Sequence, residues 1–239
     1  MKSVNLVALL LVALVLPLFG QAPFQAGIHF QLGVPQGEFG DEVDNPGFGL
    51  GGNFLYNFSQ TPFLIGGSLG FLVYGSETRN EPFSLTIPDV TVDVTTSNNI
   101  LLAHLLLRIQ PQQGFLRPYM DGLVGINYLW TDTSIRSEDF EFDDDVATST
   151  NYDDSAFSYG GGGGIMVNVW NRSITLDDTE EKKLSSVFID FGVHYLKGGK
   201  AAYLKKGDVE RTENGKVIYH PSESTTDLLN YRLGVSLAF

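Results

Sequence analysis

The sequence predicts an all-β fold: an up-and-down antiparallel eight-stranded transmembrane β-barrel. After residue 22, apolar and polar residues alternate in eight runs, which is the pattern of strands that have one apolar face. Each run is near or above the roughly 9–11 residues that a tilted strand needs to cross a bilayer. The connections between the runs alternate between short and long, which is typical of tight turns on one side of a membrane and loops on the other.

Residues 1–22 have the layout of a secretory signal peptide. Lys2 gives a basic start, residues 6–19 an apolar stretch, and "FGQA" an exit of small residues. The apolar stretch is too short for the about 20 residues of a membrane-spanning helix. We expect export with cleavage between residues 20 and 26, and one barrel domain over residues 23–239. The alternative, an apolar helix retained in the fold, fits this three-part pattern less well.

The eight runs are expected as strands at 24–34, 48–58, 63–74, 98–109, 115–130, 157–170, 186–196 and 228–239. In the first run, Phe24, Ile28 and Phe30 lie on one face, and Gln25 and His29 lie on the other. The connections 59–62 and 110–114 are short, whereas 34–47, 75–97, 131–156 and 197–227 are long. Only 171–185 is longer than its place in the series predicts.

A secreted β-sandwich is the competing fold, because its strands also alternate. Two features favour the barrel. Aromatic residues gather towards the ends of the runs, as the interfacial girdles of a membrane barrel require. The opposite face carries glycine and polar residues, a mixture suited to a narrow, packed lumen. The glycines of "YGGGGGIM" (159–166) are expected to let the wall bend, since no Lys-Ser/Thr pair follows them as in a phosphate-binding loop.

Composition narrows the classes of partner. Removing Lys2 from the 15 basic residues leaves 14 against 28 acidic ones, a balance that argues against nucleic acid as a partner. The sequence has no cysteine, so no disulfide can form after export. No cofactor motif is present, and none is expected.

Three stretches carry a family resemblance: "GFGLGGNFLYNF" (47–58), "RPYMDGLVGINYLW" (117–130) and "YRLGVSLAF" (231–239). The chain resembles the small eight-stranded bacterial outer-membrane β-barrels typified by the transmembrane domain of outer-membrane protein A, over essentially all of residues 23–239. The resemblance implies a Gram-negative cell envelope and contact with outer-membrane lipid and lipopolysaccharide. It also implies insertion by the barrel-assembly machinery.

That machinery reads a signal in the last strand, and the resemblance assigns it to Tyr231, Gly234, Leu237 and Phe239. Leu233 departs from the family pattern, which usually has a polar residue before this glycine. We further expect the run 228–239 to pair antiparallel with 24–34, because a barrel in lipid cannot leave strand edges open.

The inward face contains the candidate site, a charge network of Arg108, Arg117, Asp121, Asp190 and Arg232. Buried charges must be paired, and an eight-stranded barrel leaves an interior that side chains can fill. We therefore predict that the aspartates pair with these arginines and close the lumen. His29, His104 and His194 also face inward. No catalytic signature accompanies them, so we do not expect an enzyme.

The long connections predict what lies outside the membrane. The third, 131–156, holds a candidate calcium cluster of Asp143, Asp144, Asp145, Asp153 and Asp154. Its spacing matches no EF-hand, and a solvated acidic loop is the other interpretation. In the fourth, Asn214-Gly215 predicts a hairpin that continues the last two strands past the membrane. Residues 87–95 are expected to extend the fourth strand in the same direction.

Two functional classes follow. The first is a barrel with a closed polar lumen and a structural or surface-interaction role, acting through its extracellular loops on a partner that the sequence does not identify. The second is a porin-like passive carrier or small channel for small or apolar solutes, similar to outer-membrane protein W.

Overall fold

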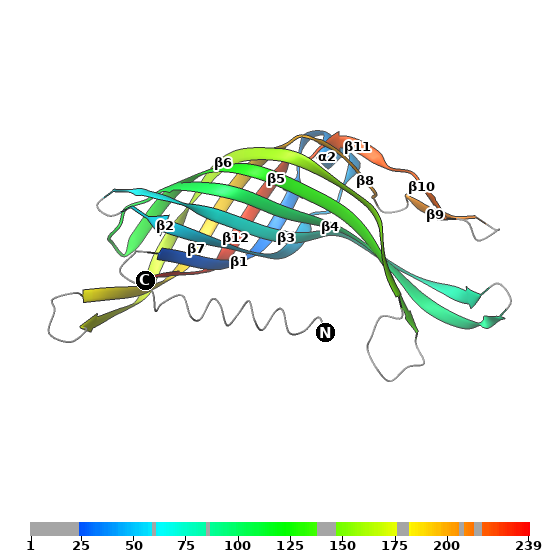
Figure 1. Ribbon diagram of the computed structural model, residues 1–239, viewed down its shortest axis with the longest axis horizontal. Coiled ribbons are helices and arrows are strands. Elements are labelled where there is room, and N and C mark those ends of the chain that lie inside the picture. Colours follow the sequence, from blue (N-terminus) through cyan, green and yellow to red (C-terminus); the bar gives the residue numbers. More distant parts are fainter. Residues whose placement is uncertain are drawn as a thin grey trace.

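A computed structural model describes residues 24–58, 61–84, 87–137, 147–175, 182–205, 208–212 and 217–239. Eight antiparallel strands close into a barrel in the order β1-β12-β7-β6-β5-β4-β3-β2 (Figure 1). They are β1 (Phe24–Pro35), β2 (Gly47–Asn57), β3 (Phe63–Ser84), β4 (Ile87–Ile109), β5 (Leu116–Ser137), β6 (Ala147–Thr175), β7 (Lys182–Gly198) and β12 (Leu228–Ala238). The predicted fold class, an eight-stranded up-and-down barrel, is confirmed. The expected signal peptide, residues 1–22, lies outside the described residues.

The barrel closes between its first and last strands. Gln25 pairs with Ala238, and the register continues without a bulge to Pro35 and Leu228. At the rim, the amide of Phe24 donates to the carbonyl of Phe239 at 2.8 Å, and the amide of Phe239 returns a bond of 2.9 Å. The predicted pairing of 228–239 with 24–34 is therefore correct, and this part of the sheet has no open edge.

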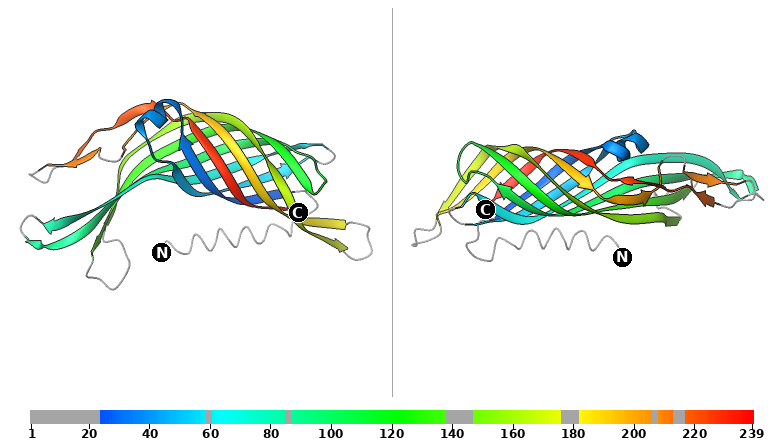
Figure 2. Two further views of the ribbon diagram at one scale, coloured as in Figure 1. Left: turned by 180° about the vertical axis from the view of Figure 1, so that it is seen from behind. Right: turned by 90° about the horizontal axis from the view of Figure 1, so that it is seen from above.

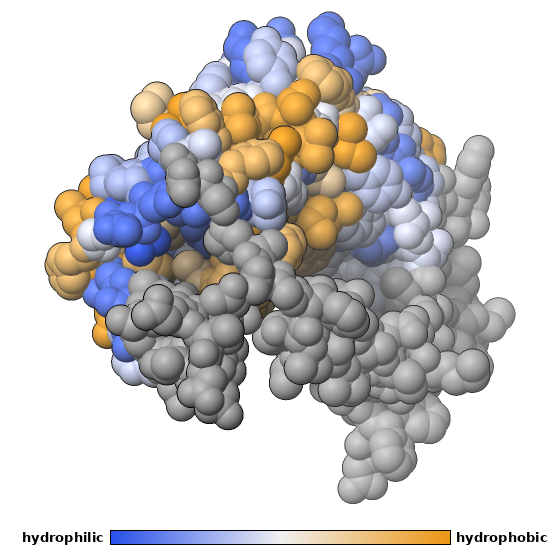
Figure 3. Space-filling model, turned by 60° about the vertical axis from the view of Figure 1, so that its left-hand side comes forward, coloured by the Kyte–Doolittle hydropathy of each residue, from blue (hydrophilic) through white to orange (hydrophobic). Residues whose placement is uncertain are grey.

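Side chains on the barrel strands alternate between an exposed apolar face and a buried interior. Outward residues such as Ile28 and Phe30 expose 72% of their surface. Figure 3 shows hydrophobic side chains gathered over part of the outer wall, bordered by hydrophilic ones. Inward neighbours such as His29 and Asn127 are buried. Among the described residues, no helix has the length and hydropathy needed to cross a membrane.

Four strands continue beyond the barrel at the end of the long loops, which we call the long-loop end. β2 pairs with β3 only as far as Val73, and the pairing of β6 with β7 begins at Ser158. Past these points, β3, β4, β5 and β6 remain paired with one another and project as a four-stranded sheet (Figure 2). The expected extension over 87–95 is thus present, and much of the two connections 75–97 and 131–156 is strand rather than loop.

The opposite end, with the turns 58–62 and 110–115, is called the short-turn end. The unexpectedly long connection 171–185 lies here, and it is partly strand. β6 and β7 continue their pairing from Asn171 with Ser186 to Thr175 with Lys182. Its length therefore comes from an extended hairpin.

The first and fourth long connections cover the long-loop mouth of the barrel. The first contains a short helix, α2 (Gly37–Glu42), which the sequence analysis did not predict. The fourth contains two small sheets, β8 (Lys200–Tyr203) with β11 (Ser222–Thr225), and β9 (Val209–Arg211) with β10 (Val217–Tyr219).

The hairpin expected around Asn214-Gly215 is present as β9 and β10, although residues 213–216 themselves lie outside the described residues. The expected continuation of the last two barrel strands past the barrel is present, with an irregularity: their pairing resumes as β8 with β11, from Lys200 with Thr225 to Tyr203 with Ser222. The pairing of β7 with β12 stops at Leu196 and Leu228. At the irregularity, the amide of Gly199 donates to the carbonyl of Phe157 on β6, and the amide of Thr226 donates to the carbonyl of Gly199 at 3.1 Å.

Candidate functional site

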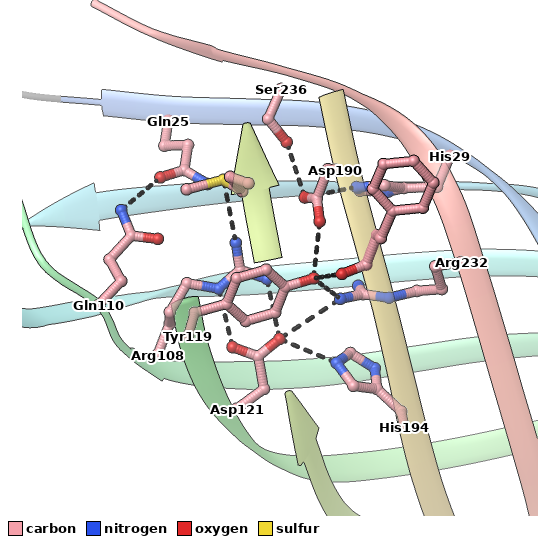
Figure 4. Close-up of polar contacts among 12 residues, drawn as sticks. Gln25, His29, Arg108, Gln110, Tyr119, Asp121, Asp190, His194, Arg232 and Ser236 are labelled. Atoms are coloured by element: carbon pink, nitrogen blue, oxygen red, sulfur yellow. Dashed lines mark hydrogen bonds and ion pairs between the residues drawn. The ribbon is translucent and has the colours of Figure 1, made fainter. Parts of the chain in front are cut away.

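A buried carboxylate, Asp121 on β5, lies at the centre of the lumen (Figure 4). Arg108 on β4 is its direct cross-strand partner, so both side chains point inward from neighbouring strands. The guanidinium of Arg108 donates from Nε and Nη2 to the two carboxylate oxygens, each at 2.8 Å. This bidentate geometry is the strong form of an arginine–carboxylate pair.

Two further groups reach Asp121 from the opposite wall. Nε2 of His194 on β7 lies 2.8 Å from Oδ2, and Nη2 of Arg232 on β12 lies 3.4 Å from the same oxygen. One carboxylate therefore ties β4 and β5 to β7 and β12 across the lumen.

The second buried carboxylate, Asp190 on β7, has neutral or histidine partners. The hydroxyl of Tyr119 donates to Oδ1 at 2.7 Å and that of Ser236 to Oδ2 at 2.9 Å. Nε2 of His29 lies 3.2 Å from Oδ2. Within the described residues, no arginine forms an ion pair with Asp190. The expectation of an arginine partner is not met, because the register places Gly234 and Met166 beside this carboxylate.

Tyr119 joins the two carboxylates into one network. Its ring lies 3.7 Å from the guanidinium carbon of Arg108, and its hydroxyl oxygen lies 3.2 Å from Nη2 of Arg232. We call this set the lumen network, and it consists of His29, Arg108, Tyr119, Asp121, Asp190, His194, Arg232 and Ser236. Two arginines balance two aspartates, which meets the requirement that buried charge be compensated.

Of the five predicted network residues, Arg117 alone lies apart. It sits near the short-turn end, with its guanidinium carbon 4.5 Å from the centre of the Phe188 ring. The sequence analysis did not assign His29, Tyr119, His194 or Ser236 to the network. Alternation placed His29 and His194 on the inward face, but partner choice depends on the stagger between strands, which the sequence does not specify.

A histidine–serine pair also lies in the lumen. Nε2 of His104 lies 3.1 Å from the hydroxyl oxygen of Ser158. A hydrolytic site needs such a pair with an orienting third group and access for substrate. Both side chains are buried, and Ser158 has no exposed surface. We therefore interpret the pair as an interior hydrogen bond.

The interior is not polar throughout, as the sequence analysis had expected, because a large set of buried apolar side chains also faces inward. An apolar cluster extends towards the long-loop end and includes Phe39, Leu72, Tyr74, Ile100, Leu102, Leu129, Leu196, Tyr203 and Leu228. Phe39, from helix α2, is fully buried, and its ring packs edge-on against Tyr74 and Tyr203 at 5.8 and 5.1 Å between centroids. Helix α2 therefore caps the barrel with an aromatic side chain.

Polar contacts hold this cap in place. Glu38 accepts from the amide of Thr225 at 3.1 Å, and the amide of Gln36 donates to the carbonyl of Asp227 at 2.9 Å. Glu42 forms an ion pair with Lys205. The helix is thus joined to the β8–β11 region, which lies beside it because β11 leads into β12, the neighbour of β1.

The candidate calcium cluster falls only partly within the described residues, because Asp143, Asp144 and Asp145 lie outside them. Asp153 accepts from the hydroxyl of Tyr128 at 3.1 Å, and Asp154 accepts from the amide of Ala202 at 2.8 Å. Across the described part of the chain, no group of three or more histidine or acidic side chains could hold a metal ion.

The residues of the expected assembly signal lie on the last strand. Tyr231 and Leu237 are exposed on the outer wall, and the ring of Phe239 lies 6.2 Å from that of Phe24 at the rim. Gly234 faces inward, where a Cβ atom would lie 2.0 Å from the carbonyl oxygen of Ile28. The close approach of β1 therefore requires glycine at this position.

Comparison with known proteins gives likeness in fold alone. No family model matches the sequence, and no curated protein matches it. Among solved structures, Neisserial surface protein A is 11% identical, with 91% of this chain and 95% of that chain covered and a TM-score of 0.36. A major outer membrane protein from Thermus thermophilus is 12% identical, with 92% and 100% covered and a TM-score of 0.41.

Proposed function

We propose that this chain is a closed outer-membrane β-barrel that anchors a projecting extracellular sheet, with a structural or surface-interaction role. The proposal includes export by the signal peptide and insertion by the barrel-assembly machinery through the last strand. The exposed apolar wall supports the membrane location, because large side chains such as Phe30, Leu105 and Met120 expose two thirds or more of their surface. A soluble protein rarely exposes so continuous an apolar surface.

The filled lumen supports an anchoring role over transport. The lumen network crosses the barrel from β4 and β5 to β7 and β12. The apolar cluster adds further buried side chains to the interior, and Phe39 of helix α2 joins it at the long-loop mouth. Eight-stranded barrels have an interior that side chains can fill completely.

The projecting sheet is the observation that carries the proposal. Cross-strand pairs of polar side chains reinforce it beyond the barrel, including Thr78 with Thr95 at 3.0 Å and Thr96 with Thr133 at 3.2 Å. Asn80 donates to Asp93 at 3.2 Å on the same hairpin. A four-stranded sheet held in this way presents a defined polar surface, and its outer strands β3 and β6 leave backbone groups for a partner chain.

The proposed placement of the barrel in the outer membrane implies what would contact each surface. Outer-membrane lipid and lipopolysaccharide would contact the apolar face, and the extracellular partner would contact the projecting sheet.

The topology can be tested with single cysteines, because the sequence has none of its own. Thr150 is exposed on the projecting sheet, and Gln113 is exposed in a short turn. In intact cells, a membrane-impermeant maleimide should label Thr150→Cys and leave Gln113→Cys unlabelled until the outer membrane is permeabilised. Equal labelling of both in intact cells, or the reverse pattern, would overturn the proposed placement.

The surface role needs a second variant. Residues 78–84 of β3 and 87–95 of β4 form the outer part of the β3–β4 hairpin, beyond the pair of Glu77 with Thr96. Adherence of cells that carry the protein is compared with adherence of cells that lack it. Replacing this part of the hairpin by Asn-Gly should leave the barrel folded and remove the adherence that the protein confers. Unchanged adherence with normal protein levels would exclude this part of the sheet as the interaction surface.

A further inference from the structure

Arg117 is a buried arginine whose charge the lumen network does not balance. Its side chain is 8% exposed, and its Nε atom is buried without a hydrogen-bond partner. Its guanidinium stacks over the ring of Phe188, and within the described part of the chain no carboxylate forms an ion pair with it. An unpaired buried charge destabilises a fold by several kcal/mol, so an anionic ligand that pairs with Arg117 would be stabilising.

A cleft of about 580 Å³ opens beside this guanidinium. Its lining includes Gln112, Phe115, Asn168, Trp170 and Asn171 as well as Arg117. Among the described residues that line the cleft, Arg117 is the one charged residue, and none is a carboxylate. Phe188 covers one face of the guanidinium. The cleft therefore supplies a positive charge, with neutral amides around it.

The amides of the cleft are held in place by hydrogen bonds. Asn168 donates to the side-chain oxygen of Asn171 at 2.6 Å, and its backbone amide donates to the carbonyl of Phe115 at 2.8 Å. Gln112 donates to the carbonyl of Phe58 at 3.4 Å. A site whose walls are fixed before binding loses less entropy when a ligand enters.

The cleft also reaches the lipid-facing wall. Val169 and Trp170 line it and expose 54% and 50% of their surface on the outside of β6. Tryptophan is the residue that marks the level of lipid headgroups. A ligand bound here would therefore place its anionic group at Arg117 and its apolar part along the wall.

We infer that the cleft binds the phosphate of an anionic phospholipid in the leaflet at the short-turn end of the barrel. Arg117 would donate to the phosphate oxygens, and the amides of the cleft would bind the polar remainder of the headgroup. This inference rests on the proposed membrane location of the barrel, and it adds a specific lipid to that proposal.

Trp170 provides the readout. The sequence has two tryptophans, and Trp130 lies on β5 nearer the long-loop end, so Trp130→Phe leaves Trp170 as the sole fluorophore. The protein is placed in nanodiscs of phosphatidylcholine with increasing amounts of phosphatidylglycerol, and brominated acyl chains quench Trp170. Quenching by brominated phosphatidylglycerol should exceed that by brominated phosphatidylcholine at equal content.

Three variants decide the role of the guanidinium. Arg117→Gln should weaken the phosphatidylglycerol preference about tenfold, which is the expected loss of one charge-assisted contact. Arg117→Lys should retain part of it. Asn171→Asp adds a negative charge at an exposed cleft position and keeps the acceptor for Asn168, so it should weaken binding without affecting folding. If Arg117→Gln does not fold, the other two variants decide.

Addition of inorganic phosphate separates the sources of the anion. Quenching that is unaffected by millimolar phosphate supports a lipid, whereas full displacement points to a free phosphate ligand and overturns the lipid assignment. An unchanged lipid preference in the Arg117 and Asn171 variants would refute the site altogether. Cysteine labelling tests the topology separately, so correct labelling with no lipid preference would defeat this inference alone.

Discussion

The two halves of the lumen are sealed by different physical means. In the polar half, Asp121 binds Arg108, His194 and Arg232, so four strands converge on one carboxylate. In the apolar half, Phe39 and its neighbours form a cluster of buried apolar side chains, and the hydroxyls of Tyr74 and Tyr203 bond to groups outside that cluster. The stability of the polar half depends on every hydrogen-bonding partner, because removal of one partner leaves the others buried and unpaired. An apolar seal loses free energy in proportion to the volume removed.

In the polar half, the largest loss of stability is expected for Asp121→Ala. This change leaves two buried arginines without their carboxylate, so the free energy of unfolding should fall by about 3–5 kcal/mol. Reversible unfolding in urea with lipid micelles measures it. Glu223→Ala is the matched control, because that carboxylate is exposed and lies 4.0 Å from Lys200. The control should cost less than about 1 kcal/mol. A similar small loss for both variants would mean that the lumen is hydrated.

The outer wall offers a contrast to both halves of the lumen. Val235 and Ile126 are exposed on the apolar wall. If these positions lie near the bilayer midplane, arginine at either one should lower the free energy of unfolding by about 2–4 kcal/mol, because its charge would face hydrocarbon. Arginine at Ile218, which is exposed on β10 outside the barrel, is the control and should change stability by about 0.5 kcal/mol or less. Small, equal effects at all three positions in a refolding titration would argue for a soluble fold.

The apolar half should respond in a graded way. Leu72 is fully buried on β3 in the apolar cluster. Leu72→Ala should lower stability by about 2–3 kcal/mol, the lower part of the range for buried leucine, because helix α2 can settle into part of the space. Leu72→Met, which nearly conserves volume, should cost less than about 1.5 kcal/mol. The same unfolding titration compares the two, and an equally large loss for methionine would contradict simple packing.

The smallest effect concerns the cap. Lys205→Met removes the ion pair with Glu42 and should cost less than about 1 kcal/mol, since both side chains are partly exposed. The hydrogen bond with Glu42 raises the pKa of Lys205, so the contact persists through neutral pH and is lost as pH rises through that higher pKa. Limited proteolysis near residues 36–43 measures opening of the cap. Susceptibility that rises well below pH 9 would contradict this assignment.

The two halves also differ in how well the sequence predicted them. Alternation placed Arg108, Asp121 and Arg232 on the inward face because a strand has a period of two. The pairing of Asp190 with Tyr119, Ser236 and His29 depends on the stagger of non-adjacent strands. The apolar cluster was missed because inward leucines such as Leu72 and Leu102 resemble the outward ones in type. Helix α2 has only six residues, too few for a helical period to show.

The fold itself was much easier to predict than these contacts. The strand positions follow from local alternation, and closure follows from the requirement that no backbone edge be left open in lipid. The position of Arg117 illustrates the limit. Its inward direction was predicted correctly, yet its place beside Phe188 at the short-turn end separates it from the aspartates.

Conductance of the purified protein in planar lipid bilayers tests the closed lumen most directly. Insertion of folded protein is verified by its heat-modifiable mobility, and membranes with detergent alone serve as the control. Because the lumen network and the apolar cluster fill the barrel, the protein should show no discrete open state at moderate voltage. A reproducible unitary conductance from the folded protein would show that the lumen is continuous, and it would favour the carrier or small-channel function over the closed anchor.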